Sequence, residues 1–135
     1  MSESRNVHIA HAILRISLGV MFLAHSVLLK VFMFGFAGTA QFFVSLGLPA
    51  ALAYLTIFAE AIGGALLVLG IGTRAVALAL IPILAGAAWV HSGNGWVFSN
   101  TGGGWEYPLF LIVISVVVAL QDRGGWRPRL LAPAV

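Results

Sequence analysis

The chain has 135 residues, of which 61% are hydrophobic and only 8% are charged, and its mean hydropathy is +1.05. Soluble domains carry about 25% charged residues, so this composition excludes an ordinary water-soluble globule and indicates one domain, residues 1–135, within a lipid bilayer. The net charge of +3 comes from basic residues beside apolar runs, not from a basic patch with exposed aromatics, which argues against a nucleic-acid partner.

Four apolar segments follow one another along the chain, at about residues 9–34, 50–69, 75–91 and 105–121. A helix crosses the ~30 Å hydrocarbon core in about 20 residues. The first two segments reach this length easily, and the last two reach it with their flanking residues. None shows the alternation of barrel strands. The sequence therefore predicts an all-α fold, an integral membrane four-helix bundle.

The connections add detail to this prediction. The first segment resembles a signal peptide only weakly, because it is long, contains Arg15 and has a poor cleavage site. Residues 39–46 ("TAQFFVSL") predict a short interfacial helix between the first two segments. Pro82 predicts a kink in the third. Small residues at four-residue spacing predict close packing of the second and third helices: Ala59 and Gly63, Ala61 and Ala65, and Ala75 and Ala79.

Arginines predict the orientation of the bundle. Arg5 precedes the first segment, Arg74 lies in the short turn between the second and third, and three more follow the fourth: Arg123, Arg127 and Arg129. Cytoplasmic loops are enriched in Lys and Arg. We therefore expect both termini in the cytoplasm, with Arg15 and Arg74 as structural or topology residues and Arg15 reaching toward the inner membrane boundary.

Six polar residues lie within or at the ends of the apolar runs: Arg15, His25, Lys30, Glu60, His91 and Glu106. Intramembrane charges cost roughly 2.5–3.5 kcal/mol each on insertion scales and usually face the bundle in pairs. Glu60 lies near the midplane, and side chains lean toward the N-terminus of their own helix. This lean favours Lys30 and His25 as partners of Glu60 over Arg15.

His91 and Glu106 fall on the same outer side, so we predict one ligand pocket formed by five residues: His25, Lys30, Glu60, His91 and Glu106. Purely structural roles remain open for each of them. Lys30 can snorkel to the headgroups, Glu106 can complement a helix dipole, and Glu60 can simply pair two helices. His8 and His11 are interpreted as interfacial residues.

Metal and haem chemistry are not favoured. The chain has no cysteine, which excludes disulfides, thiol catalysis and cysteine-ligated iron–sulfur clusters. No HxxxH or ExxH spacing supports a metal site. Two facing histidines, His25 and His91, would be needed for a b-type haem, and we predict no metal.

Several stretches resemble the DoxX family: "LRISLGVMFLAHSVLLK" its first helix, "FFVSLGLP" its outer loop, "FAEAIGGALLVLGIGTR" its second helix and "GGGWEYPL" the start of its fourth. The resemblance covers residues 14–122, and Ser26 departs from it where the family often has glycine. It implies a small four-helix protein of the bacterial inner membrane. It also implies family-type polar positions at Arg15, His25, Lys30, Glu60, Arg74 and Glu106.

The family is associated with a terminal quinol oxidase, thiosulfate:quinone oxidation and membrane oxidoreductase complexes. The resemblance thus implies an accessory subunit of a quinone-linked redox system, with redox proteins as partners and a bound quinone as the one expected small molecule. His25 and Lys30 would donate to a carbonyl oxygen, and the two glutamates would orient them or relay protons. The alternatives are a non-enzymatic assembly subunit and a small oligomeric transporter.

Overall fold

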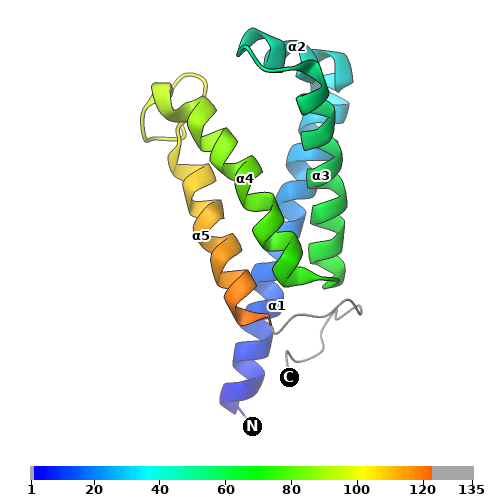
Figure 1. The fold of residues 1–135 in the computed structure, drawn as a ribbon. Coiled ribbons are helices and arrows are strands. Elements are labelled where there is room, and N and C mark those ends of the chain that lie inside the picture. Colours follow the sequence, from blue (N-terminus) through cyan, green and yellow to red (C-terminus); the bar gives the residue numbers. More distant parts are fainter. Residues whose placement is uncertain (1, 123–135) are drawn as a thin grey trace.

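The computed structural model describes residues 2–122, and every regular element there is a helix (Figure 1). In chain order these are α1 (Ser2–Leu23), η1 (Ala24–Met33), α2 (Gly35–Ser45), α3 (Ala50–Leu69), α4 (Thr73–His91), η2 (Ser92–Asn94) and α5 (Glu106–Gln121). The predicted all-α class is confirmed. Arg123, Arg127 and Arg129 lie outside the described residues.

Three helical stretches of the described chain are long and apolar enough to cross a membrane: Glu3–Met33, Ala50–Leu69 and Thr73–Asn94. The fourth predicted span corresponds to α5, an apolar helix of 16 residues. At 1.5 Å per residue α5 measures about 24 Å, a length that local thinning of the bilayer accommodates. The chain is therefore a membrane protein built as a helical bundle.

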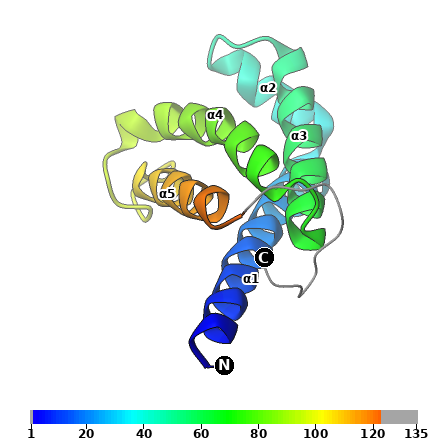
Figure 2. The same ribbon diagram turned by 60° about the horizontal axis from the view of Figure 1, so that its bottom comes forward.

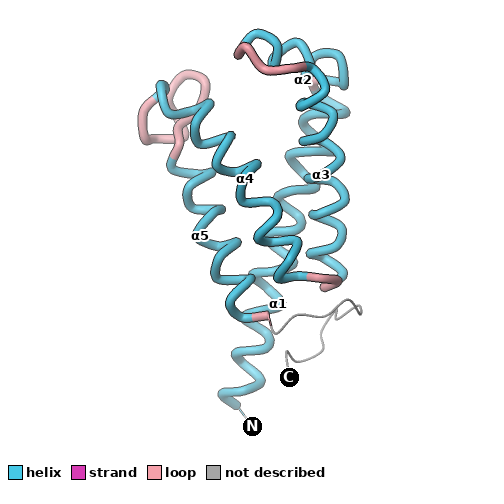
Figure 3. Tube along the Cα trace, viewed as in Figure 1, coloured by secondary structure: helices cyan, strands magenta, loops and turns pink. Residues whose placement is uncertain are grey.

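The bundle consists of two helix pairs (Figures 1 and 2). Helix α1 packs along α3, and α4 packs along α5. The loops lie at the two ends, and α2 lies across the end remote from the N-terminus (Figure 3). We call this the outer end, and the end with the α3–α4 turn the inner end. Core side chains come from all four long helices: Leu18, Phe22, Leu67, Leu80, Leu84 and Val118.

Two glycines set the distance between α1 and α3. A Cβ added to Gly19 would lie 2.7 Å from the carbonyl oxygen of Gly64, and a Cβ at Gly64 would lie 2.8 Å from that of Gly19. The two backbones therefore touch. Close packing of α3 on α4 occurs at Gly63, against the Leu80 side chain. Gly63 is one of the small residues that predicted this packing, which is confirmed there, whereas Ala75 and Ala79 are exposed.

The first membrane helix changes its hydrogen-bond pattern after Leu23. Its outer part, η1, is a π-helix of 10 residues, and the N–H of Phe34 donates to the carbonyl oxygen of Leu29, five residues earlier, at 2.8 Å. The sequence predicted one uninterrupted helix over residues 9–34. Wide turns of this kind are rare and frequently occur at functional sites. Here the wide turns carry His25 and Lys30.

Helix α2 returns the chain across the outer end. It begins at Gly35, whose φ of +73° is a conformation that glycine adopts without strain. The Thr39 hydroxyl lies 2.9 Å from the carbonyl oxygens of both Lys30 and Gly35. This contact fixes α2 on the last turn of η1. The helix starts four residues earlier than the predicted interfacial segment.

Candidate functional site

Lys30 and Glu60 form an ion pair between η1 and α3. The Lys30 Nζ donates to Oε2 of Glu60 at 2.7 Å, and the two side chains are 20% and 7% exposed. Glu60 thus faces the bundle, and its carboxylate is neutralised by Lys30 midway along α3. The sequence favoured Lys30 and His25 as partners of Glu60, and the structure pairs Glu60 with Lys30. The alternative partner, Arg15, binds elsewhere.

Arg15 is buried, with 2% of its surface exposed, and its side chain points toward the inner end in the expected direction but binds α3 there. Its Nη1 donates to the carbonyl oxygens of Leu67 and Val68 at 2.6 and 2.9 Å. These carbonyls belong to the last turn of α3, where few backbone donors follow, although that of Leu67 also accepts from the N–H of Gly70 at 3.2 Å. A cation there also complements the helix dipole.

Arg74 binds backbone carbonyl groups at the end of α5, as Arg15 does at the end of α3. Its Nε donates to the carbonyl oxygen of Ala119 at 3.0 Å, and its Nη2 donates to that of Asp122. The Asp122 side chain acts electrostatically on Arg15. Arg15 and Arg74 therefore tie α1, α3, α4 and α5 together at the inner end.

A further hydrogen bond completes this arrangement: Nδ1 of His11 donates to Oε1 of Gln121 at 3.1 Å. We call these residues the inner polar cluster: His11, Arg15, Arg74, Gln121 and Asp122. His11 is 8% exposed and Asp122 is 4% exposed, so both are packed inside the bundle; the interfacial depth expected for His11 stays a prediction. Sequence reasoning missed Gln121 and Asp122, although Asp122 is the first charge after the apolar run of α5.

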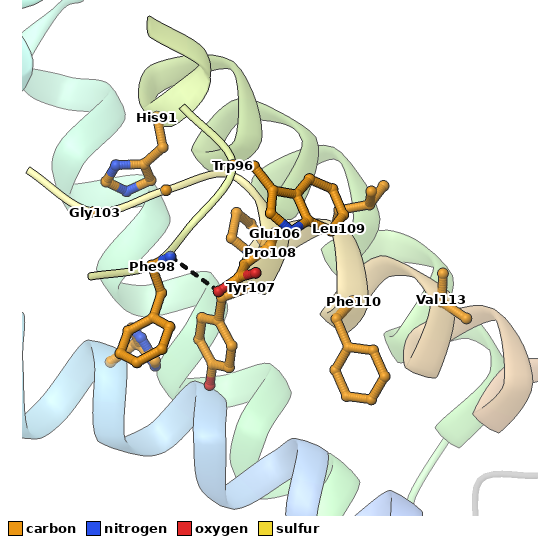
Figure 4. Close-up of a pocket in the computed structure, with 12 residues that line it drawn as sticks. His91, Trp96, Phe98, Gly103, Glu106, Tyr107, Pro108, Leu109, Phe110 and Val113 are labelled. Atoms are coloured by element: carbon orange, nitrogen blue, oxygen red, sulfur yellow. Dashed lines mark hydrogen bonds between the residues drawn. The ribbon is translucent and has the colours of Figure 1, made fainter. Parts of the chain in front are cut away.

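An open cleft of about 970 Å³ lies at the outer end, between η1, α5 and the loop that precedes α5. Figure 4 shows the side chains that line it. Three predicted pocket residues are among them, His25, His91 and Glu106. Lys30 and Glu60 are not, so the single predicted pocket is divided into an ion pair and a separate cleft. We call the latter the outer cleft.

Aromatic and apolar residues form most of the wall of the outer cleft. They come from the loop and from the first turns of α5: Trp96, Phe98, Tyr107, Pro108, Leu109, Phe110 and Val113. Sequence reasoning missed Tyr107, although it stands between Glu106 and Pro108 in the stretch that carried the family resemblance. Apolar walls with few polar groups are typical of sites for lipophilic ligands.

Two buried polar atoms in this wall have no hydrogen-bond partner within the described chain, the Tyr107 hydroxyl and Nδ1 of His91. Leaving such a group unsatisfied costs about 1–3 kcal/mol. Buried polar groups are nearly always paired in proteins, with protein, water or ligand. Both residues line the outer cleft, so a bound molecule would pair with either atom once that side chain turns toward the cleft.

His25 lies beside Tyr107 with its ring stacked at 5.8 Å between centroids. Its Nδ1 is 2.9 Å from the carbonyl oxygen of Met21. Because a carbonyl oxygen only accepts, Nδ1 carries the hydrogen and Nε2 is the acceptor in the neutral ring. His25 on η1 thus has one free hydrogen-bond acceptor, Nε2, and Tyr107 on α5 has a hydroxyl.

Glu106 contacts the loop before α5. Its Oε1 accepts from the N–H of Phe98 at 2.9 Å (Figure 4), and its own N–H donates to the carbonyl oxygen of Trp96 at 3.2 Å. The Glu106 carboxylate is therefore directed at loop backbone. In residues 2–122 no three His, Asp or Glu side chains are grouped so that they could hold a metal ion.

Comparison with known proteins gives two matches. A family model described as DoxX matches residues 10–93. A Bacillus subtilis (strain 168) protein named "Putative oxidoreductase CatD" is 38% identical over 117 residues, which is 87% of this chain and 82% of that protein. No solved structure matches the chain.

Proposed function

The chain belongs to the DoxX family, and from this premise we propose that it is an accessory subunit of a redox system in the bacterial inner membrane that binds a quinone or a similar lipophilic carbonyl compound in the outer cleft. The observation that carries this proposal is the pair of buried, unpartnered polar atoms in an aromatic wall, the Tyr107 hydroxyl and Nδ1 of His91. A carbonyl oxygen accepts the hydrogen bond that the Tyr107 hydroxyl has to offer.

The rest of the cleft suits the body of such a molecule. Planar rings are favoured by neighbouring aromatic faces, which Phe98 and Tyr107 supply. The cleft is open, so an apolar tail can extend into the bilayer. The name of the Bacillus relative, an oxidoreductase, agrees with a redox setting. When bound, a quinone supplies two-electron carrier chemistry, and this chain's residues bind and orient it.

This proposal changes the roles first assigned to the polar residues. Lys30 and Glu60 hold each other outside the outer cleft, so they do not donate to the ligand. Tyr107 takes the role of donor. His25 holds the Tyr107 ring in place by stacking.

The test is binding of a short-chain ubiquinone to the purified protein, followed by quenching of tryptophan fluorescence, since Trp96 lines the cleft. We expect saturable quenching that Tyr107→Phe weakens about tenfold, the loss that one hydrogen bond of about 1.4 kcal/mol causes. The chain has two tyrosines, so Tyr54→Phe, on exposed α3 surface, is the matched control. Quenching without saturation, or equal affinity of Tyr107→Phe, would contradict the proposal.

The inner polar cluster favours a second candidate, a non-enzymatic assembly subunit. Its contacts join four helices without any ligand. Under this alternative no quinone binds, and the chain serves a partner through its folded bundle alone. The same titration distinguishes the two.

A further inference from the structure

We propose that Glu106 is a positioning residue: its carboxylate holds the segment 96–98 at the outer cleft, so that the Phe98 ring gates the cleft, and its charge does not act on the ligand. This inference rests on the proposed function, because it assigns a role within the same cleft. It departs from the sequence-based expectation that Glu106 orients donors or relays protons.

Two backbone hydrogen bonds join the two sides of the loop before α5. The N–H of Trp105 donates to the carbonyl oxygen of Gly95, and the N–H of Glu106 donates to that of Trp96, both at 3.2 Å. The Glu106 side chain then adds a further bond, 2.9 Å long, from the N–H of Phe98. The carboxylate therefore extends the pairing to the residue whose ring lines the cleft.

Packing around these hydrogen bonds leaves the segment little room to move. A Cβ at Gly104 would collide with the backbone carbonyl oxygens of Trp96 and Val97, so the two sides of the loop touch backbone to backbone. The Trp96 and Trp105 rings meet edge to face with centroids 4.4 Å apart. Phe98 follows these contacts in the chain, and its backbone N–H is bound by the Glu106 carboxylate.

The Phe98 ring stands at the rim of the cleft. It lines the cavity, yet its exposed fraction is 69%. A large apolar side chain in this position limits how a ligand enters and leaves, and its position depends on the backbone that Glu106 binds. The neighbouring Val97 is also exposed, at 41%, but does not line the cleft. Val97 is thus a control on the same loop.

Two substitutions at Glu106 distinguish positioning from direct use of charge. Glu106→Gln keeps an Oε1 that accepts from the Phe98 N–H and removes the charge, whereas Glu106→Ala removes both. The measured quantity is the dissociation rate of a short-chain ubiquinone. We expect Glu106→Ala and Phe98→Ala to release it at least about tenfold faster. Glu106→Gln and Val97→Ala should stay within about threefold of the unsubstituted protein.

Two results would overturn the inference. If Glu106→Gln releases the quinone as fast as Glu106→Ala does, the charge acts on the ligand. If Phe98→Ala releases the quinone at the normal rate, the ring is no gate. Hydrogen exchange of the Phe98 amide, measured without ligand, separates this inference from the proposed function. Glu106→Ala should speed that exchange and Glu106→Gln should not, whether or not the unsubstituted protein binds a quinone; equal exchange in both variants would also refute the positioning role of Glu106.

Discussion

The Lys30 ammonium and the Glu60 carboxylate meet at 2.7 Å between η1 and α3, and the Glu60 side chain is 7% exposed. This pair explains how a carboxylate is accommodated halfway along an apolar helix. Because neither group lines the outer cleft, the pair is expected to contribute to stability and not to ligand affinity.

Replacing Glu60 tests that expectation. Removing one partner of a buried charge pair typically costs about 3–5 kcal/mol, since the other charge is left unpaired. Glu60→Gln and Lys30→Met should each lower the free energy of unfolding in detergent, and the double variant should lose much less than the sum of the two. Additive losses, or an altered affinity for ubiquinone in Glu60→Gln, would contradict this assignment. Glu3→Gln, at an exposed site, is the control.

Arg15→Lys should also destabilise the protein, by about 1–3 kcal/mol. Arg15 is buried and donates to two carbonyl oxygens of α3, and a lysine lacks the guanidinium fork that reaches partners in several directions. A buried carbonyl left unsatisfied accounts for a loss of this size. Thermal unfolding in detergent measures it. Arg5→Lys, at an exposed position, should change stability by less than about 0.5 kcal/mol, and equal melting of the two variants would show that Arg15 is not held as described.

The contact between Gly19 and Gly64 gives a packing prediction. Gly19→Ala would place a Cβ 2.7 Å from a backbone oxygen, so α1 and α3 must move apart, at a cost of about 1–3 kcal/mol. Gly86→Ala is the matched control in α4, because no atom outside its own turn of helix lies within 4 Å of its added Cβ, and alanine is the better helix former. We expect the first variant to melt earlier and the second not to; a normal melting temperature for Gly19→Ala would show that the helices can separate freely.

Much of the fold follows from the sequence alone. Runs of apolar residues long enough to span a bilayer have few structures open to them, and the segment predicted at residues 50–69 has the same bounds as α3. The wide turns of η1 were not predicted, because no single residue type specifies them. They coincide with two tertiary contacts, the pair of Lys30 with Glu60 and the contact of Thr39 in α2 with the carbonyl oxygen of Lys30.

The candidate site was harder to predict because depth alone does not fix direction around a helix. Lys30 and His25 were placed at the correct end, yet Lys30 points to α3 and His25 stacks on Tyr107 of α5. Arg15 was assigned by its distance from the inner boundary. In the structure a close crossing of α1 and α3 places it against the carbonyls at the end of α3, a tertiary contact that no local pattern encodes.

The orientation of the bundle is the last prediction, with both termini in the cytoplasm. The loops of the outer end, residues 34–49 and 92–105, contain no Lys or Arg, and Lys30 near that end is neutralised by Glu60. Arg5 and Arg74 lie toward the inner end, where α1 begins and α5 ends (Figure 1). Because positive charge is retained in the cytoplasm, a C-terminal alkaline phosphatase fusion should be inactive and a C-terminal green fluorescent protein fusion bright. A fusion within residues 92–105 should give the opposite pattern, and an active phosphatase at the C-terminus would reverse the assignment of inner and outer ends.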